Sequence, residues 1–434
     1  MRGMTATIVF SLLASVAIGG MSGTYTIKPA GGGDFLTLYA AGEAIDSLGM
    51  SGNCVFEIYG DTLPGPFYAD GVSGSDSWTT TFRPGPGEDP VILGDEFRCA
   101  SFHNVKIENL RFLTAYMTIA GSSGWRISGC RFSTHDWAVK IVDASSTCDT
   151  IDGNWFDVWG TGMGHYPIII VESGRDNIIS NNMIGDDTCG LDVLVDFDHA
   201  ANTRFIFNTV RMSPLDAGFG NCFWTDGNVP CEVRNNVFVL AQPATEYNAC
   251  VSIYPTSDSV LLDYNCYFVE SLGYIGARPF YPDLYDWSGW RGLGFEANGI
   301  NADPRLVSST DLHLRPGSPC NQRATPIAGI GFDIDGDPRD PTRPDMGADE
   351  IAGDAVEERH LPQASSHKPQ ATVVRGVLCV PPSLLTANSS LLSIDGRKVL
   401  GLKSGANDVR ALAPGIYFVR EAQAQAVRKM VITR

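Results

Sequence analysis

Basic residues are scarce in this chain of 434 residues: 31 Lys and Arg stand against 49 Asp and Glu, which gives a formal net charge of −18. This shortage of positive charge excludes a general nucleic-acid-binding protein. Charged residues of both signs make up only 18% of the chain, whereas hydrophobic residues make up 44%. A chain of this composition buries a large core and is not disordered along its length.

Several motifs of familiar enzymes and metalloproteins are missing. The 11 cysteines form no CxxC pair, which argues against a zinc site and against a thioredoxin-like motif. No serine nucleophile motif and no phosphate-binding loop stands out. Cys222 and Cys231 are the cysteines closest together in sequence, and an exported protein could join them. An interior of free thiols is the alternative, because free Cys packs well among apolar side chains.

Long apolar runs are also missing, except at the N-terminus. Arg2 precedes the almost wholly apolar stretch Thr5–Ile18, and small residues follow it. This is the pattern of a secretory signal peptide, which we predict over residues 1–21. A buried N-terminal strand is the alternative. No other stretch approaches the roughly 18 apolar residues of a membrane helix, so we expect no membrane span in the mature protein.

What the sequence does contain is a repeat. The unit is a pattern of six residues that recurs seven times. Its first and last residues are apolar, its fourth residue is usually Asn, and the other three vary. The units begin at Ile107, Ile127, Ile151, Ile179, Phe205, Val233 and Leu262. Units of 20 to 29 residues with β-branched and aromatic residues at alternate positions predict a β-solenoid, because each coil can pair its strands only with the coils above and below.

The fixed position of the repeat predicts a ladder of side chains. Asn at the same turn of successive coils can bond to the next Asn and to backbone carbonyls. Leu110 and Cys130 occupy this position in the first two units, so we expect the ladder to begin in the third. Its members would be structural rather than catalytic: Asn154, Asn182, Asn208, Asn236 and Asn265.

This pattern resembles the right-handed parallel β-helix of the pectate-lyase-like superfamily. The segment Leu36–Leu48 looks like the N-terminal capping helix of that class, with Leu38, Ala41, Ile45 and Leu48 on one face. The segments 294–307, 311–320 and 331–350 resemble the part of such proteins that follows the coils. The resemblance implies an all-β fold: a right-handed parallel β-helix (solenoid) with an N-terminal capping helix over residues 22–353.

A second, smaller domain is expected after a polar, proline-containing linker at residues 354–370. Residues 371–434 hold nine Lys and Arg against three Asp and Glu, opposite in sign to the rest of the chain. Short strand-like runs between turn residues predict a small β-sandwich. Its runs Gly396–Leu400, Leu412–Arg420 and Lys429–Arg434 resemble the C-terminal sorting domain of bacterial type IX secretion substrates.

That resemblance implies a partner, the outer-membrane secretion machinery, and a secreted or cell-surface location reached through the periplasm. The alternative is an ordinary β-sandwich module that binds something else.

The candidate site is a column of carboxylates. Glu172, Asp198 and Asp226 each lie seven residues before the start of a repeat, and Asp143 lies within one residue of this column. Stacked carboxylates repel unless a cation binds them, one keeps its proton, or solvent and turn amides separate them. The column could therefore hold Ca²⁺ through oxygen ligands, or pair a protonated acid with an ionised base for glycoside cleavage.

Nearby residues complete the prediction. Asp196 lies two residues before Asp198 and joins the catalytic candidates, while His199 and Trp224 are candidates for binding substrate. The resemblance implies a Lys or Arg base for a lyase, and Lys140, Arg175 and Arg204 are available; Lys140 is also a substrate-binding candidate. The alternative is that these acidic residues only cap their own turns.

A second acidic string, Asp333-Ile-Asp335-Gly-Asp337, is interpreted as a structural turn rather than a metal loop, because no bidentate Glu follows at the twelfth position.

Two functions follow from these observations. The first is a secreted or cell-surface β-helix protein that binds an extracellular polysaccharide. If this protein is an enzyme, it cleaves the polysaccharide as a lyase or glycoside hydrolase. The second is a non-catalytic surface or adhesion protein with the solenoid as a rigid display scaffold. The acidic composition disfavours a strongly anionic polymer unless Ca²⁺ bridges the two.

Overall fold

The computed structural model describes residues 19–351, apart from 165–166, 192, 214–219, 227–228, 242–247, 254–258 and 279–282. It also describes residues 372–433, apart from 376, 381–389, 394–396, 404, 414 and 421–426. The chain forms two compact units, Met1–Ala352 and Gly353–Arg434. Most of the predicted signal peptide and all of the predicted linker lie outside the described residues.

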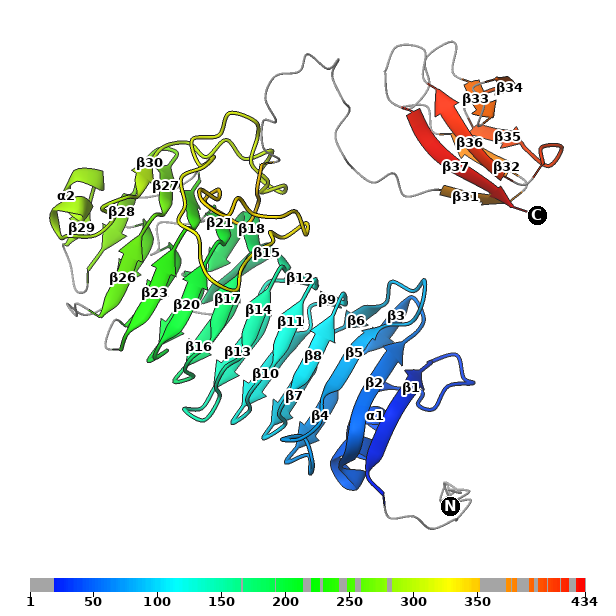
Figure 1. Cartoon of the computed structure of the whole chain (residues 1–434), viewed down its shortest axis with the longest axis horizontal. Helices are drawn as coiled ribbons and strands as arrows, with labels where there is room; N and C mark the ends of the chain where they lie inside the picture. The colour runs from blue at the N-terminus through cyan, green and yellow to red at the C-terminus, as the bar shows by residue number, and fades with distance from the viewer. Residues whose placement is uncertain are drawn as a thin grey trace, which may run out of the picture. The chain divides into compact units, whose positions relative to one another are not determined.

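The first unit is a right-handed parallel β-helix built from three ten-stranded sheets, which confirms the predicted fold (Figure 1). Each coil contributes one strand to each sheet, so successive coils lie side by side. Every pairing within the three sheets is parallel except that of β28 with β29. Sheet A contains β1 (Met21–Ile27), β2 (Met50–Ile58), β5 (Thr80–Pro84), β8 (Val105–Glu108), β11 (Arg126–Ser128), β14 (Thr150–Asp152), β17 (Ile178–Ser180), β20 (Thr203–Ile206), β23 (Cys231–Arg234) and β26 (Val260–Asp263).

Sheets B and C complete each coil. Sheet B contains β3 (Thr62–Pro64), β6 (Val91–Leu93), β9 (Arg111–Leu113), β12 (Arg131–Thr134), β15 (Trp155–Gly164), β18 (Met183–Leu191), β21 (Thr209–Met212), β24 (Val237–Leu240), β27 (Cys266–Val269) and β30 (Ile300–Asn301). Sheet C contains β4 (Phe67–Asp70), β7 (Glu96–Ala100), β10 (Tyr116–Ala120), β13 (Val139–Val142), β16 (Ile169–Glu172), β19 (Val193–Asp198), β22 (Asn221–Thr225), β25 (Ala249–Ile253), β28 (Tyr274–Ala277) and β29 (Leu284–Tyr285).

The sequence repeat marks the turn from sheet A to sheet B. The first apolar residue of each unit lies in sheet A, and these residues pair in register from coil to coil, as Ile127 does with both Ile107 and Ile151. The second apolar residue lies in sheet B and points inward. Phe112, Phe132 and Phe156 stack there with ring centroids 4.8 and 4.9 Å apart. The repeat therefore supplies two columns of the core.

The predicted asparagine ladder is present at this turn. Asn154 Nδ2 donates to Asn182 Oδ1 (3.0 Å) and to the carbonyl of Ile127 (2.9 Å), and the same pattern continues down the column. All five asparagines are fully buried. Leu110 and Cys130 hold the position in earlier coils, as expected, and the Cys130 N–H donates to Asn154 Oδ1.

A residue outside the repeat ends the ladder. Glu296 Oε1 accepts from Asn265 Nδ2 (2.7 Å) and from the Tyr267 hydroxyl (2.7 Å), while Oε2 accepts from the Asn265 N–H. Burial raises the pKa of Glu296 to about 7. Glu296 therefore takes the place of a further asparagine, because its carboxylate accepts the hydrogen bonds of Asn265, the last asparagine of the ladder.

The N-terminal end of the solenoid is covered by α1 (Leu38–Leu48), whose N-cap Thr37 accepts from the Ala40 N–H. This helix confirms the predicted cap. Leu38, Ala41 and Ile45 are buried, but Leu48 is 62% exposed, so the predicted apolar face ends one turn earlier. Gly42 allows the close approach to β4, because a Cβ there would lie 2.5 Å from the Tyr68 carbonyl.

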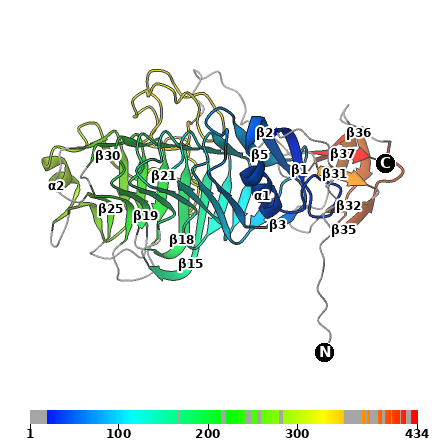
Figure 2. The same cartoon turned by 90° about the horizontal axis from the view of Figure 1, so that it is seen from below.

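After α2 (Trp287–Gly292), residues 302–351 fold back over the outer face of sheet B (Figure 2). Ala348 N–H donates to Thr209 Oγ1, and Gly347 N–H donates to the Asn235 carbonyl. Arg339 is buried here: its Nη2 donates to Asn181 Oδ1 (2.8 Å), and the guanidinium lies 4.0 Å from the Phe207 ring centroid. We call residues 302–351 the closing segment.

The second unit contains β31 (Thr372–Arg375), β32 (Val377–Val380), β33 (Ser390–Ser393), β34 (Lys398–Gly401), β35 (Gly405–Asp408), β36 (Gly415–Arg420) and β37 (Val427–Thr433). Five strands form one sheet in the order β31-β37-β36-β33-β34, and β32 pairs with β35. The pairings are antiparallel except for the parallel pair β31–β37. A small, mainly antiparallel all-β unit is thus present, as expected.

None of the nine cysteines whose side chains the structure describes forms a disulfide, and only Cys148 among them is exposed. Cys222 and Cys231 lie in sheets C and A and form no disulfide. Within the described residues, no helix is long and apolar enough to cross a membrane.

Candidate functional site

The predicted site residues lie on the outer face of sheet C. Strand alternation sends Ile141, Val171 and Phe197 into the core, where all are fully buried. Their neighbours therefore face outward in two registered columns. One column contains Lys140, Ile170, Asp196 and Trp224, and the other contains Val142, Glu172 and Asp198.

Asp226 extends the second column by one coil. Thr225 ends β22 in register with Phe197, and the N–H of Asp226 donates to the Phe197 carbonyl (3.3 Å). The stacking of Glu172, Asp198 and Asp226 in successive coils is thus present in the structure.

His199 brings two of these carboxylates together. Its backbone is in the left-handed region (φ 55°), which turns the ring back over the strand end. Nδ1 lies 2.7 Å from Asp198 Oδ1 and 3.1 Å from Asp226 Oδ2. Ser173, which follows Glu172 in the preceding coil, has the same left-handed backbone (φ 64°), so this conformation belongs to the turn that ends each strand here. We call Asp198, His199 and Asp226 the histidine cluster.

The two carboxylates differ in their surroundings. The Asp226 side chain is 5% exposed, whereas those of Asp198 and His199 are 42% and 58% exposed. The hydrogen bond from His199 to Asp198, together with the charge of Asp226, raises the pKa of His199 above its ordinary value of 6.5. The two carboxylates therefore favour the imidazolium form of His199, and Nε2 is the ring nitrogen that neither carboxylate contacts in the structure.

Glu172 belongs to a separate pair. Lys140 Nζ lies 3.5 Å from Glu172 Oε2 and 4.9 Å from the centroid of the Trp137 ring. Trp137 in turn packs edge-on against Tyr116, with centroids 6.1 Å apart. A cation and two aromatic rings thus lie on the same side of the solenoid, two coils before the histidine cluster.

The remaining predicted residues are distributed around this face. Asp196 is 3% exposed, and Trp224 pairs with it in register on the next strand. Asp143 caps its own turn by accepting from the Ser145 N–H and Oγ. Arg204 lies in sheet A, paired with Glu232 at 2.6 Å, and Arg175 lies in the turn that follows sheet C. Neither arginine joins the outer face of sheet C.

The fit to Ca²⁺ is poor. This ion takes six to eight oxygen ligands, while the groups that converge are two carboxylates and an imidazole nitrogen within 4.8 Å of one another. A histidine nitrogen is not one of the oxygen ligands that Ca²⁺ prefers. Here Nδ1 is hydrogen-bonded to Asp198 Oδ1 and lies 3.1 Å from Asp226 Oδ2 in an ion pair. The residues are arranged as a histidine held by two acids, so no step of a mechanism is derived through a metal.

Sequence reasoning did not foresee how the column is neutralised. It considered a bound cation, a retained proton or separation of the acids, but the protein's own His199 and Lys140 supply the positive charge. It also missed Trp137 and Tyr116 near the site. Their only signal was proximity: Trp137 lies three residues before Lys140, and Tyr116 begins the neighbouring strand β10.

A second group of a histidine and acids has a structural explanation. His313 Nδ1 lies 2.5 Å from Asp311 Oδ1, and Nε2 lies 2.9 Å from Asp335 Oδ2. Both ring nitrogens are therefore bonded within the closing segment. Asp333 accepts from the N–H groups of Asp335 and Asp337, as in the predicted structural turn.

Comparisons with known proteins find similarity in structure only. No family profile and no curated protein matches the sequence. The crystal structure of the pectate lyase Pel9A covers 77% of this chain, and the match spans 98% of that protein, at 11% identity and a TM-score of 0.42. A mutant of the PL6-family alginate lyase AlyGC covers 82% of this chain and matches over 61% of its own length, at 11% identity and a TM-score of 0.22. With such scores, function must be argued from this chain's own residues.

Proposed function

We propose that this chain binds an extracellular polysaccharide along the outer face of sheet C and cleaves a glycosidic bond at the histidine cluster. The observation that carries the proposal is the imidazole of His199 between two carboxylates of unequal burial, 2.7 and 3.1 Å away. Pairs of titratable groups in contrasting environments are the usual basis of acid–base catalysis.

Each member of the cluster has a distinct role in this proposal. Charged His199 donates a proton from Nε2 to the leaving glycosidic oxygen. Exposed Asp198 accepts a proton, either from an attacking water or from the carbon next to a uronate carboxyl group. Buried Asp226 is a positioning residue that keeps the ring oriented and charged. Water attack gives a saturated product end and elimination gives an unsaturated one.

Substrate binding is assigned to neighbouring residues on the same face. The rings of Trp137 and Trp224 offer flat apolar surfaces for sugar rings. Lys140, 4.9 Å from the Trp137 ring centroid, adds a cation. Successive coils advance by about 4.8 Å, so a chain lying along the solenoid axis would meet these residues and the histidine cluster in turn.

The test is a depolymerisation assay on the full chain with neutral and anionic polysaccharides, with Ca²⁺ or with a chelator. New reducing ends and the absorbance of unsaturated uronate report the two reaction types. We expect His199→Gln to lower the rate by about 10²-fold or more. His103→Gln, a change in an earlier coil, should leave it unchanged. Activity should fall as the pH rises through the raised pKa of His199, because the proton donor is lost.

A non-catalytic surface or adhesion protein is the second candidate. It is favoured by the mutual pairing of charges on this face, Lys140 with Glu172 and His199 with two aspartates. Absence of product from every polymer, in protein shown to be folded, would contradict the enzyme proposal and support this one.

We also infer that the unit Gly353–Arg434 is an address for type IX secretion, which would place the protein outside the cell or on its surface. The support is the motif resemblance and the small all-β unit at that position. The test is expression of the full chain, with and without this unit, in a bacterium that has the machinery. Secretion that persists without the unit would contradict the inference.

A further inference from the structure

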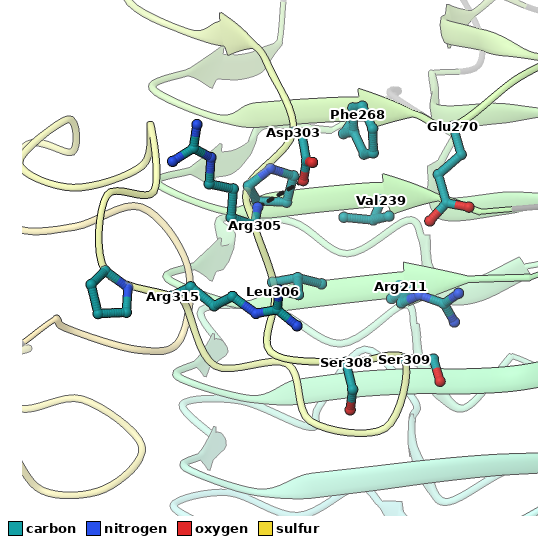
Figure 3. A pocket seen from close by; sticks show the side chains of 12 residues that line it. Arg211, Val239, Phe268, Glu270, Asp303, Arg305, Leu306, Ser308, Ser309 and Arg315 are labelled. Atoms are coloured by element: carbon teal, nitrogen blue, oxygen red, sulfur yellow. Dashed lines mark hydrogen bonds between the residues drawn. The ribbon is translucent and has the colours of Figure 1, made fainter. Parts of the chain in front are cut away.

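A pocket of about 540 Å³ lies on the outer face of sheet B, away from the histidine cluster (Figure 3). Its floor consists of Arg211, Val239 and Phe268, which are paired in register on β21, β24 and β27. The closing segment forms the opposite wall with residues 303–306, 308–309 and 315–316. The volume is typical of sites for small ligands.

The pocket is lined by more cations than anions although the chain carries a net charge of −18. Arg211, Arg305 and Arg315 stand against Glu270 and Asp303. Figure 3 shows the Arg315 side chain extending past Leu306 toward the side on which Arg211 stands, whereas Arg305 points the other way. Arg211 and Arg315 are therefore the two arginines that a ligand in the pocket would meet.

The arginines of the closing segment are held in place by neutral groups. Arg315 Nη2 donates to the Val307 carbonyl, and Arg305 Nη1 donates to the Gly317 carbonyl (3.0 Å). Neither of these two arginines has an ion pair within the described residues. Hydrogen bonds to carbonyls fix a guanidinium without cancelling its charge, and its remaining donors match the geometry of a carboxylate.

The rest of the lining suits a sugar. Half-buried Phe268, with Val239 and Leu306, offers an apolar surface to the C–H face of a ring. Glu270 and Ser309 also line the pocket and offer oxygen atoms to hydroxyl groups, whereas Ser308 Oγ accepts from the N–H groups of Thr310 and Asp311 in its own turn (Figure 3). A site that binds and orients a small ligand usually has an apolar floor with a few polar groups around it.

We propose that this pocket binds a short acidic saccharide, a uronate-containing mono- or disaccharide, with its carboxylate on Arg211 and Arg315 and one ring face on Phe268. The acidic group follows from the arginines, whereas the choice of a saccharide over another carboxylate rests in part on the proposed function. The site would act as a second anchor for polymer ends or products.

The test is calorimetric titration of the full chain with digalacturonate. Cellobiose serves as a neutral disaccharide, and succinate serves as a dicarboxylate without a sugar ring. We expect binding of digalacturonate to weaken tenfold or more in both Arg211→Gln and Arg315→Gln. The matched control is Arg343→Gln, which removes the same charge from an exposed position of the closing segment outside the pocket. It should bind like the unchanged protein, and thermal unfolding confirms that each variant is folded.

Three results would overturn the proposal: no binding to the unchanged protein, equal weakening in Arg343→Gln, or equal affinity for cellobiose or succinate. A titration of Asp226→Asn separates this proposal from the previous one. Binding that survives in that variant but is lost in Arg315→Gln places the saccharide in the pocket, whatever happens to activity at the histidine cluster. Binding that is lost only in Asp226→Asn places it on sheet C and overturns the pocket.

Discussion

Asp149 is a buried acid whose ionised form destabilises the folded protein. It lies at the turn from sheet C to sheet A and is 1% exposed. Its Oδ1 accepts from the Trp125 N–H, and its own N–H donates to Asn177 Oδ1, as in a short ladder of two members. The second oxygen, Oδ2, has no hydrogen-bond partner. Burial raises the pKa of Asp149 to about 7, so the folded protein at neutral pH holds a costly half-ionised acid.

We predict that Asp149→Asn stabilises the protein above pH 7. The folded-state pKa lies above the usual 3.8, so the unchanged protein loses stability as the pH rises from about 4 to about 7, while the variant does not. The difference should reach at most about 4 kcal/mol. Urea unfolding at pH 5 and pH 8 measures it, with exposed Asp61→Asn as the control. A variant less stable than the unchanged protein at pH 8 would contradict the argument.

His313 is the opposite case, because its charge is stabilised by its surroundings. The hydrogen bond to Asp335, with that to Asp311, raises the pKa of His313 to about 9. A raised histidine pKa contributes stability that is complete below about pH 6.5 and is lost as the pH rises through 9. After a discount for solvent screening, we expect about 1–2 kcal/mol. His313→Gln should abolish this dependence between pH 6 and 10 in thermal unfolding, and an unchanged pH profile in the variant would refute the assignment.

At the scale of elements, the end of the asparagine ladder depends on Gly299, which lies against the Glu296 carboxylate. A Cβ at Gly299 would lie 2.1 Å from Glu296 Oε2, and Glu296 accepts three hydrogen bonds from Asn265 and Tyr267. Gly299→Ala should displace the carboxylate, leave buried donors unpaired and cost about 2–4 kcal/mol. Gly292→Ala is the matched control because nothing lies within 4 Å of its added Cβ. A Gly299→Ala protein with unchanged thermal stability would show that the ladder end is not constrained in this way.

The asparagine ladder and the carboxylate column show which features could be predicted from the sequence and which could not. The ladder was predictable because Asn recurs at a fixed place in units of similar length. Its end at Glu296 was not, because Glu296 lies outside the repeat and reaches the turn through the path of α2 and the segment after it. The carboxylate column was likewise predictable from spacing. The contact of His199 with two of its members was not, because the spacing of the repeat does not show which way a side chain in the turn points.

The closing segment shows a further limit of prediction. Similarity placed residues 331–350 after the coils but did not show where they pack. They lie along the outer face of sheet B, with Arg339 bonded to Asn181 and lying on the Phe207 ring. Phe207 has a left-handed backbone at a position where five other coils have Gly or Asn and one has Tyr264. Such a contact between residues more than 130 positions apart leaves no local signal in the sequence. The arginine pocket depends on the same long-range packing and could not be predicted either.

At the scale of the whole molecule, the two units should unfold separately. No sheet of the described residues combines strands from both units, and the solenoid has its own cap, core and ladder. Repeat architectures are stabilised by contacts between neighbouring coils, so removal of Gly353–Arg434 should leave these contacts intact. We predict that a chain ending at Ala352 unfolds within about 2 °C of the solenoid transition of the full chain, a shift that corresponds to roughly 1–1.5 kcal/mol for a unit of this size.

Differential scanning calorimetry of both proteins tests this expectation, with Gly299→Ala introduced into each as an internal control. If the units are independent, this substitution lowers the solenoid transition equally in the two proteins, because Glu296 and Asn265 belong to the solenoid alone. A large loss of stability on truncation, or a Gly299→Ala effect that depends on the second unit, would mean that the second unit supports the coils. That result would also weaken the inference that the unit serves as an address, because an address should be removable without cost to the protein that carries it.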